Sequence, residues 1–169
     1  REHGADVPFL RDAALATDTA GTWDVLRAVV QQYAAIGQQF DTITLLQPTS
    51  PLRDAADIKM AFEIFEEKNA QSVVSVCEAE HSPLLCNTLK EDQSMCGFVD
   101  LQKVGRRQDM GTYYRLNGAI CLQTTELLMS QGDLYGEHSY ACVMSQEHSI
   151  DIDTALDFQI AETIMRASS

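Results

Sequence analysis

The sequence has no long apolar run, no signal-peptide pattern and few basic residues. No stretch approaches the roughly 18 apolar residues that a membrane-spanning helix needs, and the chain does not open like a secretory leader. The 12 basic residues are outnumbered by 25 acidic ones, which gives a net charge of −13. Because a nucleic-acid surface needs clustered lysine and arginine, this balance argues against nucleic-acid binding. We therefore expect a cytoplasmic protein that binds neither membrane nor nucleic acid.

Cysteine pairs and repeats are also missing. The cysteines are odd in number and form no CxxC pair, which disfavours a disulfide framework and a zinc site (Cys77, Cys86, Cys96, Cys121 and Cys142). We expect reduced thiols. No internal repeat, linker or low-complexity tract divides the chain, and 169 residues with 45% hydrophobic content suffice for one domain with a sizeable core.

Apolar periodicity predicts alternating helices and strands. Helices are expected over about residues 23–36, from residue 55, over 125–129 and after 153; strands are expected over 42–46, 72–76, 118–122 and 140–144. Asp54 and Asp57 are spaced like a helix capping pair. In the last helix we expect an inward face of Leu156, Ile160, Ala161 and Ile164. The alternation predicts an α/β fold with a mainly parallel sheet flanked by helices on both faces.

Two polar segments are the candidate site. Residues 47–53 (QPTSPLR) follow an apolar strand, where open α/β sheets place their ligands. In residues 149–153 (SIDID), an extended chain would put Asp151 and Asp153 on one face, roughly 7 Å apart, so that both reach one hard cation. This pattern favours magnesium and a phosphate-bearing substrate. The alternatives are a plain turn whose hydroxyls cap the next helix, and an edge strand followed by Asp153 as an N-cap.

Arginine is enriched locally in this acidic chain. Eight of the 12 basic residues are arginine, and Arg106, Arg107 and Arg115 fall within ten positions. The planar guanidinium suits carboxylate and phosphate groups, so the cluster indicates anion binding. Surface ion pairs that contribute little are the alternative. Arg115 precedes Asn117-Gly118, where glycine lets a ligand approach the backbone, which favours function.

Several separated motifs stand in the order found in one enzyme family. They are Asp18-Thr19, LLQPTSPLR (45–53), SVVSV (72–76), EHSP (80–83), RLNGAI (115–120) and SIDID (149–153). From about residue 8 to 163 the chain resembles the CMP-sialic acid synthetases, also called acylneuraminate cytidylyltransferases. Each motif alone is weak, but the ordered set is specific.

The resemblance implies a nucleotidyltransferase that joins CTP to a nine-carbon acidic sugar and releases pyrophosphate, with Mg²⁺ neutralising the triphosphate. Matched motif by motif, Asp151 and Asp153 are the catalytic magnesium ligands. The substrate side comprises Gln47, Arg107, Arg115 and Asn117, and the nucleotide side comprises Arg11, Asp18 and Thr19.

The resemblance also implies a Rossmann-like homodimer. An arm within about residues 96–145 would reach into the neighbour's site, and its aromatic pair falls on Leu134 and Tyr135, so one aromatic is replaced. The tyrosine that often follows Gly-Ala-Ile is Cys121 here. These two departures leave three sugars as alternatives, namely sialic, legionaminic and pseudaminic acid.

The family's opening strand and glycine-rich phosphate loop have no counterpart in this sequence. We therefore expect residues 1–169 to be an N-terminally incomplete catalytic domain, short by on the order of 50 residues and inactive by itself. The alternative to an enzyme is a non-catalytic module that serves in dimerisation or binding.

Overall fold

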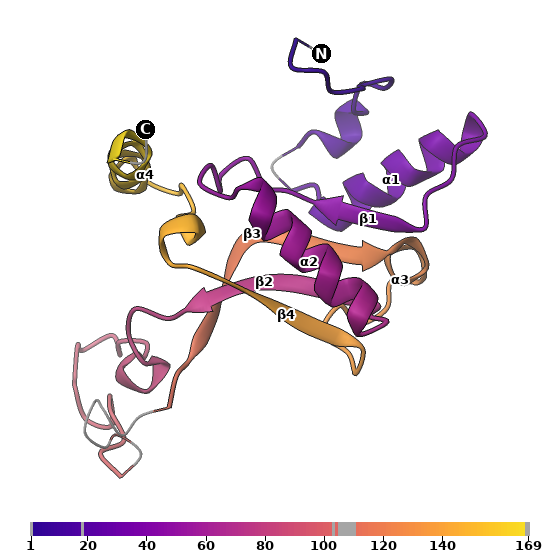
Figure 1. Ribbon diagram of the computed structural model, residues 1–169. Helices are drawn as coiled ribbons and strands as arrows, with labels where there is room; N and C mark the ends of the chain where they lie inside the picture. The colour runs from indigo at the N-terminus through magenta and orange to yellow at the C-terminus, as the bar shows by residue number, and fades with distance from the viewer. Residues whose placement is uncertain (1, 18, 103, 105–110, 168–169) are drawn as a thin grey trace.

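A mixed four-stranded sheet with helices around it forms the body of the protein (Figure 1). The computed structural model describes residues 2–17, 19–102, 104 and 111–167. The strands are β1 (Thr42–Leu45), β2 (Ser72–Glu78), β3 (Tyr114–Thr124) and β4 (Ser139–Met144). The helices are α1 (Thr22–Ala35), α2 (Ala55–Glu67), α3 (Thr125–Ser130) and α4 (Ala155–Ala167). The predicted α/β class and most element positions are confirmed.

The sheet is only partly parallel. Its order is β1-β3-β2-β4, and β3 runs antiparallel to both β1 and β2, whereas β2 and β4 pair in parallel. Three strands, β1, β2 and β4, therefore run in the same direction, as expected of a mainly parallel sheet. Only one of the three strand pairs, β2 with β4, is parallel, so the expected pairing is wrong. The antiparallel strand was missed because apolar content marks a strand without giving its direction.

A large bulge interrupts β3. Between the pairs Val74–Cys121 and Val76–Leu116, β2 uses one residue, Ser75, whereas β3 uses four, 117–120. The Ser75 side chain is fully buried, and its hydroxyl accepts from the backbone N–H of Ile120 at 2.7 Å. Polar groups freed by the bulge thus find a partner inside the core, which stabilises an irregular backbone in mid-sheet.

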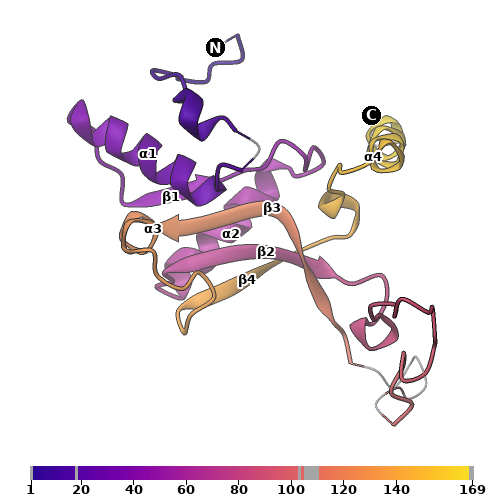
Figure 2. The ribbon, with the colours of Figure 1, turned by 180° about the vertical axis from the view of Figure 1, so that it is seen from behind.

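Helix α2 covers one face of the sheet, in front of it in Figure 1 and behind it in Figure 2. Its N-terminus carries the predicted capping box, since the Asp54 carboxylate accepts from the N–H of Asp57 at 3.0 Å and the Asp57 carboxylate from that of Asp54 at 3.0 Å. The core lies between α2 and β2, β3 and β4, around Ala61, Ala70, Val73, Ala119, Ile120, Leu122, Cys142 and Met144.

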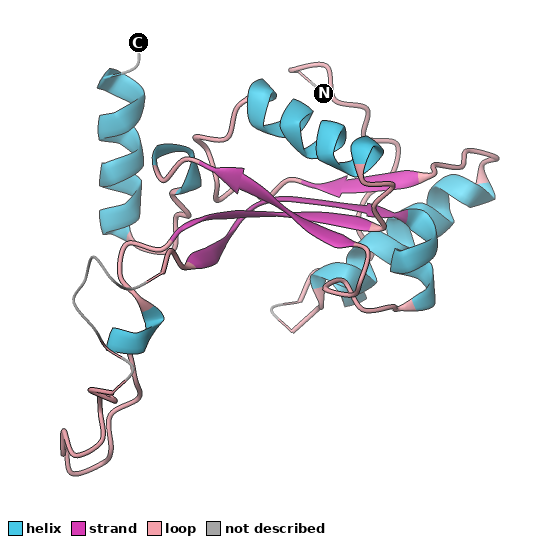
Figure 3. Ribbon diagram, turned by 60° about the horizontal axis from the view of Figure 1, so that its bottom comes forward, coloured by secondary structure: helices cyan, strands magenta, loops and turns pink. Residues whose placement is uncertain are grey.

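The last helix departs from expectation. Helix α4 stands apart from the sheet (Figure 3), and Leu156 and Ile160 are exposed, whereas Ala161 is buried. The prediction that Leu156 and Ile160 face inward is wrong, because periodicity marks an apolar face without naming what covers it.

A long excursion joins β2 to β3 and extends away from the body at the lower left of Figure 1. Its described part, residues 79–102, 104 and 111–113, contains one short 3-10 helix, Pro83–Leu85, and loops. Among the described residues, no helix has the length and apolarity needed to cross a membrane.

Candidate active site

The loop after β1 is tied to β3 by one arginine. The Arg53 guanidinium donates from Nη1 to the carbonyl of Ala119 at 2.6 Å and to that of Gln47 at 3.2 Å. Partial burial lowers the pKa of Arg53, and the charge of Asp57 opposes that shift. Both ends of the loop are therefore fixed against the bulge in β3.

Gly118 sits in the bulge at a point of close approach. Its φ of +71° lies in the left-handed region that favours glycine. A methyl group there would lie 2.6 Å from Oε1 of Gln47 and 3.4 Å from Oδ2 of Asp151. Three segments far apart in the sequence thus meet at this glycine, and two of them bring the side chains that the sequence marked, Gln47 and Asp151.

The segment carrying the two aspartates is not a strand. Residues 147–149 form a short 3-10 helix and residues 150–153 follow as irregular chain, so the predicted strand is wrong. Instead, the N–H of Ile152 donates to the carbonyl of Thr49 at 2.8 Å, which joins this segment to the loop after β1. Asp151 is half-buried and Asp153 is exposed.

The segment after β1 does form a turn, with Ser50 N donating to the carbonyl of Gln47 at 3.3 Å, but the helix-capping roles considered for the two segments are not observed. Thr154 and Asp157 cap α4, with Thr154 N donating to Asp157 Oδ2 at 2.7 Å and Asp157 N donating to Thr154 Oγ1 at 3.3 Å. Asp153 is therefore not the N-cap. Asp54, rather than a hydroxyl of the preceding loop, caps α2.

Two buried oxygens at this junction lack a partner among the described residues, namely Oδ1 of Asp151 and Oγ of Ser50. The segments that carry them are joined by the hydrogen bond between Ile152 and Thr49. Because buried polar groups are nearly always satisfied, an orphaned carboxylate oxygen indicates a place for a ligand, an ion or water. A donor set of carboxylate, amide and hydroxyl oxygens suits a hard cation such as Mg²⁺.

Asn117 lies in the core behind the site. It is 2% exposed, and its amide donates from Nδ2 to Ser149 Oγ at 2.8 Å while Oδ1 accepts from Ala119 N at 3.2 Å and from Ser75 Oγ at 2.5 Å. These bonds use the amide inside the core. The structure thus places Asn117 as the link between the bulge and the segment that carries Asp151, without a free polar atom facing outward.

Arg115 forms a two-pronged ion pair with Glu80 at the base of the excursion. Nε lies 3.0 and 3.2 Å from the two carboxylate oxygens, and Nη2 lies 2.6 Å from Oε1. Hydrogen bonding to Arg115 lowers the pKa of Glu80 to about 2, although partial burial opposes the shift. The same bond raises the pKa of Arg115, with smaller contributions from nearby negative charges that include Asp151.

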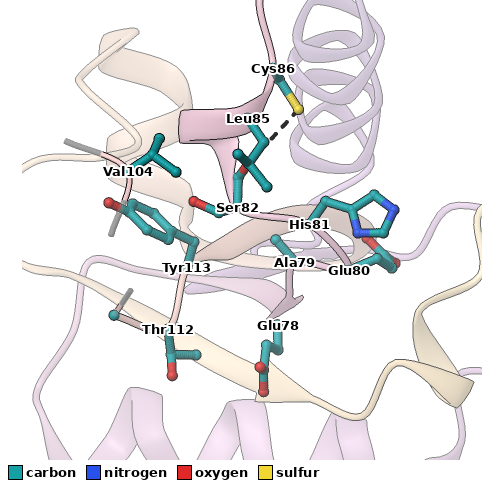
Figure 4. A pocket seen from close by; sticks show the side chains of 11 residues that line it. Glu78, Ala79, Glu80, His81, Ser82, Leu85, Cys86, Val104, Thr112 and Tyr113 are labelled. Carbon is teal, nitrogen blue, oxygen red and sulfur yellow. Dashed lines mark hydrogen bonds between the residues drawn. The ribbon is translucent and has the colours of Figure 1, made fainter. Parts of the chain in front are cut away.

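A cavity of about 590 Å³ opens beside this pair. Among the residues that line it, Figure 4 shows Glu80 and His81 on one side, Val104 and Tyr113 on the other, and Ser82 and Leu85 between them. Its polar and apolar lining, next to a fixed arginine, is of the kind that holds a polar organic ligand.

A second group of potential metal ligands lies at the start of α2. One ligand atom each from Asp54, Asp57 and His148 lies within 4.8 Å of the others. His148 Nδ1 lies 2.8 Å from Oδ2 of Asp57, and both aspartates accept the capping hydrogen bonds of α2. The capping box and the His–Asp pair account for this group.

The structure brings together part of the predicted set. Gln47, Arg115 and Asp151 converge around the bulge, with Asn117 beneath them. Arg11 and Thr19 lie in the segment before α1, and no hydrogen bond or ion pair joins them to this group among the described residues. Asp18 and Arg107, together with Arg106, fall outside the described residues.

Leu134 and Tyr135 lie at the far end of the sheet. The carbonyl of Leu134 accepts from Ser72 Oγ at 2.7 Å, at the N-terminal end of β2, whereas Gln47 and Asp151 follow the C-terminal ends of β1 and β4. Tyr135 is exposed and Leu134 is half-buried.

Sequence reasoning assigned no part in the candidate site to the individual side chains of Glu80, Ser75 or Ser50. Glu80 belongs to the motif EHSP, but Arg115, with which it pairs, is 35 positions further along the chain. No local sequence feature marks that pairing. Ser75 carries a signal in retrospect, since it is a lone hydroxyl among valines in a buried strand.

Known proteins with similar sequences share one kind of activity in their names. An N-acylneuraminate cytidylyltransferase of Streptococcus agalactiae is 36% identical over 93% of this chain and 37% of its own length. A CMP-N,N'-diacetyllegionaminic acid synthase of Legionella pneumophila is 33% identical over 97% of this chain and 71% of its own length. A pseudaminic acid cytidylyltransferase of Campylobacter jejuni is 25% identical, over 99% and 72% respectively. No protein-family model matches the chain.

Proposed function

Because the chain belongs to the family of nonulosonic acid cytidylyltransferases, we propose that the complete protein transfers CMP from CTP to a nonulosonic acid and releases pyrophosphate. The chain spans 37% of the length of the Streptococcus relative and 71% of that of the Legionella relative, so the proposal concerns the complete protein. Its main support is the convergence of Gln47 and Asp151 on Gly118, next to an oxygen that no described residue satisfies.

The roles of the residues follow from their chemistry. The Gln47 amide both donates and accepts, which suits the hydroxyls of a sugar. The fixed guanidinium of Arg115 suits the sugar carboxylate. In the reaction, the anomeric hydroxyl oxygen bonds to the α-phosphorus of CTP, its proton is lost, and the bond from that phosphorus to the departing pyrophosphate breaks. Gly118 lets the reacting groups approach the backbone closely.

Asp151 and Asp153 are the residues that would hold Mg²⁺. The orphaned, buried Oδ1 of Asp151 and the exposed carboxylate of Asp153, which is not used in the helix cap, fit a hard cation. When bound, the cation neutralises phosphate charge. The protein's own part is to hold two carboxylates beside the loop after β1, through the bond between Ile152 and Thr49.

A Rossmann-like homodimer belongs to the same proposal. Tyr135 is 60% exposed and lies at the end of the sheet opposite Gln47, so it serves the proposed sugar site only across an interface. A tyrosine offers a broad apolar face with a polar tip, which suits an arm that enters a neighbour's site.

The direct test is product formation by the complete protein. It should release pyrophosphate from CTP in the presence of sialic, legionaminic or pseudaminic acid, and mass spectrometry should identify the CMP-sugar. The preferred acid would decide among the three sugars. No release with any of the three would reject the proposal.

The same assay tests the metal ligands. Asp151→Asn and Asp153→Asn should each lower turnover by about 100-fold or more, since the metal contributes several kcal/mol. The Asp151 variant should be at least as stable as the wild type in denaturant, because Oδ1 has no hydrogen bond to lose among the described residues. Asp41→Asn, an exposed aspartate before β1, is the control. Wild-type turnover in both variants at low magnesium would remove these residues from the site.

A further inference from the structure

The guanidinium of Arg115 is held by one edge. Its Nε and Nη2 face the Glu80 carboxylate at 2.6–3.2 Å, and Nη2 also lies 3.5 Å from the carbonyl of Ser149. Nη1 has no hydrogen-bond partner among the described residues. One edge of the fork is therefore used to fix the side chain, and the remaining donors stay available to a ligand.

The ion pair is better suited to orienting Arg115 than to stabilising the fold. The side chains of Arg115 and Glu80 are 36% and 52% exposed. Ion pairs at this exposure typically contribute less than about 1 kcal/mol to folding. Two-pronged geometry nevertheless fixes the plane of the guanidinium, and a planar donor binds a carboxylate well only when its plane is fixed.

Asp151 is the competing carboxylate. Arg115 Nη2 lies 3.5 Å from the carbonyl of Ser149, two positions before Asp151, and Oδ2 of Asp151 lies 3.4 Å from the Cβ position of Gly118, three positions after Arg115. A guanidinium released from Glu80 therefore has a second anionic partner within reach. Pairing with it would neutralise the carboxylate that the proposed function assigns to the metal.

We propose that Glu80 is a positioning residue that holds Arg115 towards the sugar acid and away from Asp151. This inference rests on the proposed function for the identity of the acid, but the orientation of Arg115 is a property of the protein alone. Glu80 then serves two groups at once, because it fixes the anion-binding arginine and leaves the Asp151 carboxylate available.

The experiment compares three variants of the complete protein. Glu80→Gln removes the anionic partner, Glu80→Asp keeps the charge on a shorter side chain, and Glu66→Gln removes an exposed charge on α2 that is not part of the cavity lining. We expect Glu80→Gln to raise KM for the sugar acid about tenfold and the Mg²⁺ concentration for half-maximal activity several-fold, with KM for CTP nearly unchanged. Glu80→Asp should recover part of the loss, and Glu66→Gln should change these constants less than twofold.

Two measurements need no turnover. Calorimetry of the sugar acid with the substrate-free protein should show about tenfold weaker binding in Glu80→Gln. The ¹⁵Nε signal of Arg115 should shift in Glu80→Gln and should shift again, towards the position of an unpaired arginine, when Asp151→Asn is added, because the double variant has lost both anionic partners. An unchanged or lower KM for the sugar acid in Glu80→Gln would overturn the proposal. So would an Arg115 signal that is the same in Glu80→Gln with and without Asp151→Asn. Absence of turnover in the wild type rejects the proposed function alone, and the signal of Arg115 still decides the role of Glu80.

Discussion

Replacement of Gly118 by alanine separates backbone strain from function. At φ of +71°, an L-residue costs about 1–2 kcal/mol in the left-handed region, so Gly118→Ala should lower the free energy of unfolding by that amount. The added methyl group would also stand 2.6 Å from Oε1 of Gln47. This oxygen ends a flexible side chain, which can swing away, so the contact itself adds little to the stability loss.

The effect on catalysis should be far larger than the effect on stability. Gln47 would leave its position, and the methyl group would fill the space between it and Asp151. A displacement of about 1 Å in a positioned group can cost about 100-fold in rate, so we expect a loss of about 100-fold in kcat/KM for the sugar acid.

Gly37→Ala is the matched control. Gly37 has a φ of +80°, but no atom lies within 4 Å of the position that a methyl group would take. It should therefore show the same loss of 1–2 kcal/mol in urea denaturation, with wild-type activity in the pyrophosphate assay. Equal activity in the two variants would refute the argument that Gly118 is required for close approach.

Three further predictions concern charge, thiols and assembly. The pKa of Glu80 is about 2 in the folded protein against 4.5 for an ordinary glutamate, so the stability from its ion pair is present above pH 4.5 and is lost as the pH falls towards 2. The difference in unfolding free energy between wild type and Glu80→Gln, below about 1 kcal/mol because the pair is half-exposed, should vanish over that window in denaturation at several pH values. Iodoacetamide at pH 8 should label exposed Cys86 and Cys96 and spare Cys121, whose pKa burial raises to about 11; mass spectrometry would reveal any contrary labelling. Tyr135→Ala should remain dimeric in light scattering yet bind the sugar acid more weakly in calorimetry, and a monomeric wild type would contradict the exchanged arm.

Local signals predicted the regular elements well. The capping pair at Asp54 and Asp57 and the apolar stripe after it gave α2, because both features depend on residues within one or two turns. The α/β class, which is confirmed, was likewise predicted from local patterns of apolar and polar residues. The motif around Asp151 was also found in the sequence, although its predicted strand is absent from the structure.

Long-range features were not predictable in the same way. The bulge at residues 117–120 depends on the hydroxyl of Ser75, which is 42 positions away from Asn117. The pairing of Arg115 with Glu80 likewise depends on the path of the intervening excursion. Alternation of apolar and polar residues carries no information on either, since it describes one strand at a time.

The strand order has a consequence for how this protein folds. β1 and β2 are successive in the chain but do not pair with each other; each pairs with β3, which is synthesised later. The unit from β1 through α2 to β2 therefore lacks the hydrogen bonds that would hold its two strands as neighbours until β3 enters between them. Formation of this sheet requires closure of long loops, which slows folding relative to a sheet of neighbouring hairpins. Since Gly118 lies on β3, the strand that links β1 to β2, the candidate site forms only once β3 has joined the sheet.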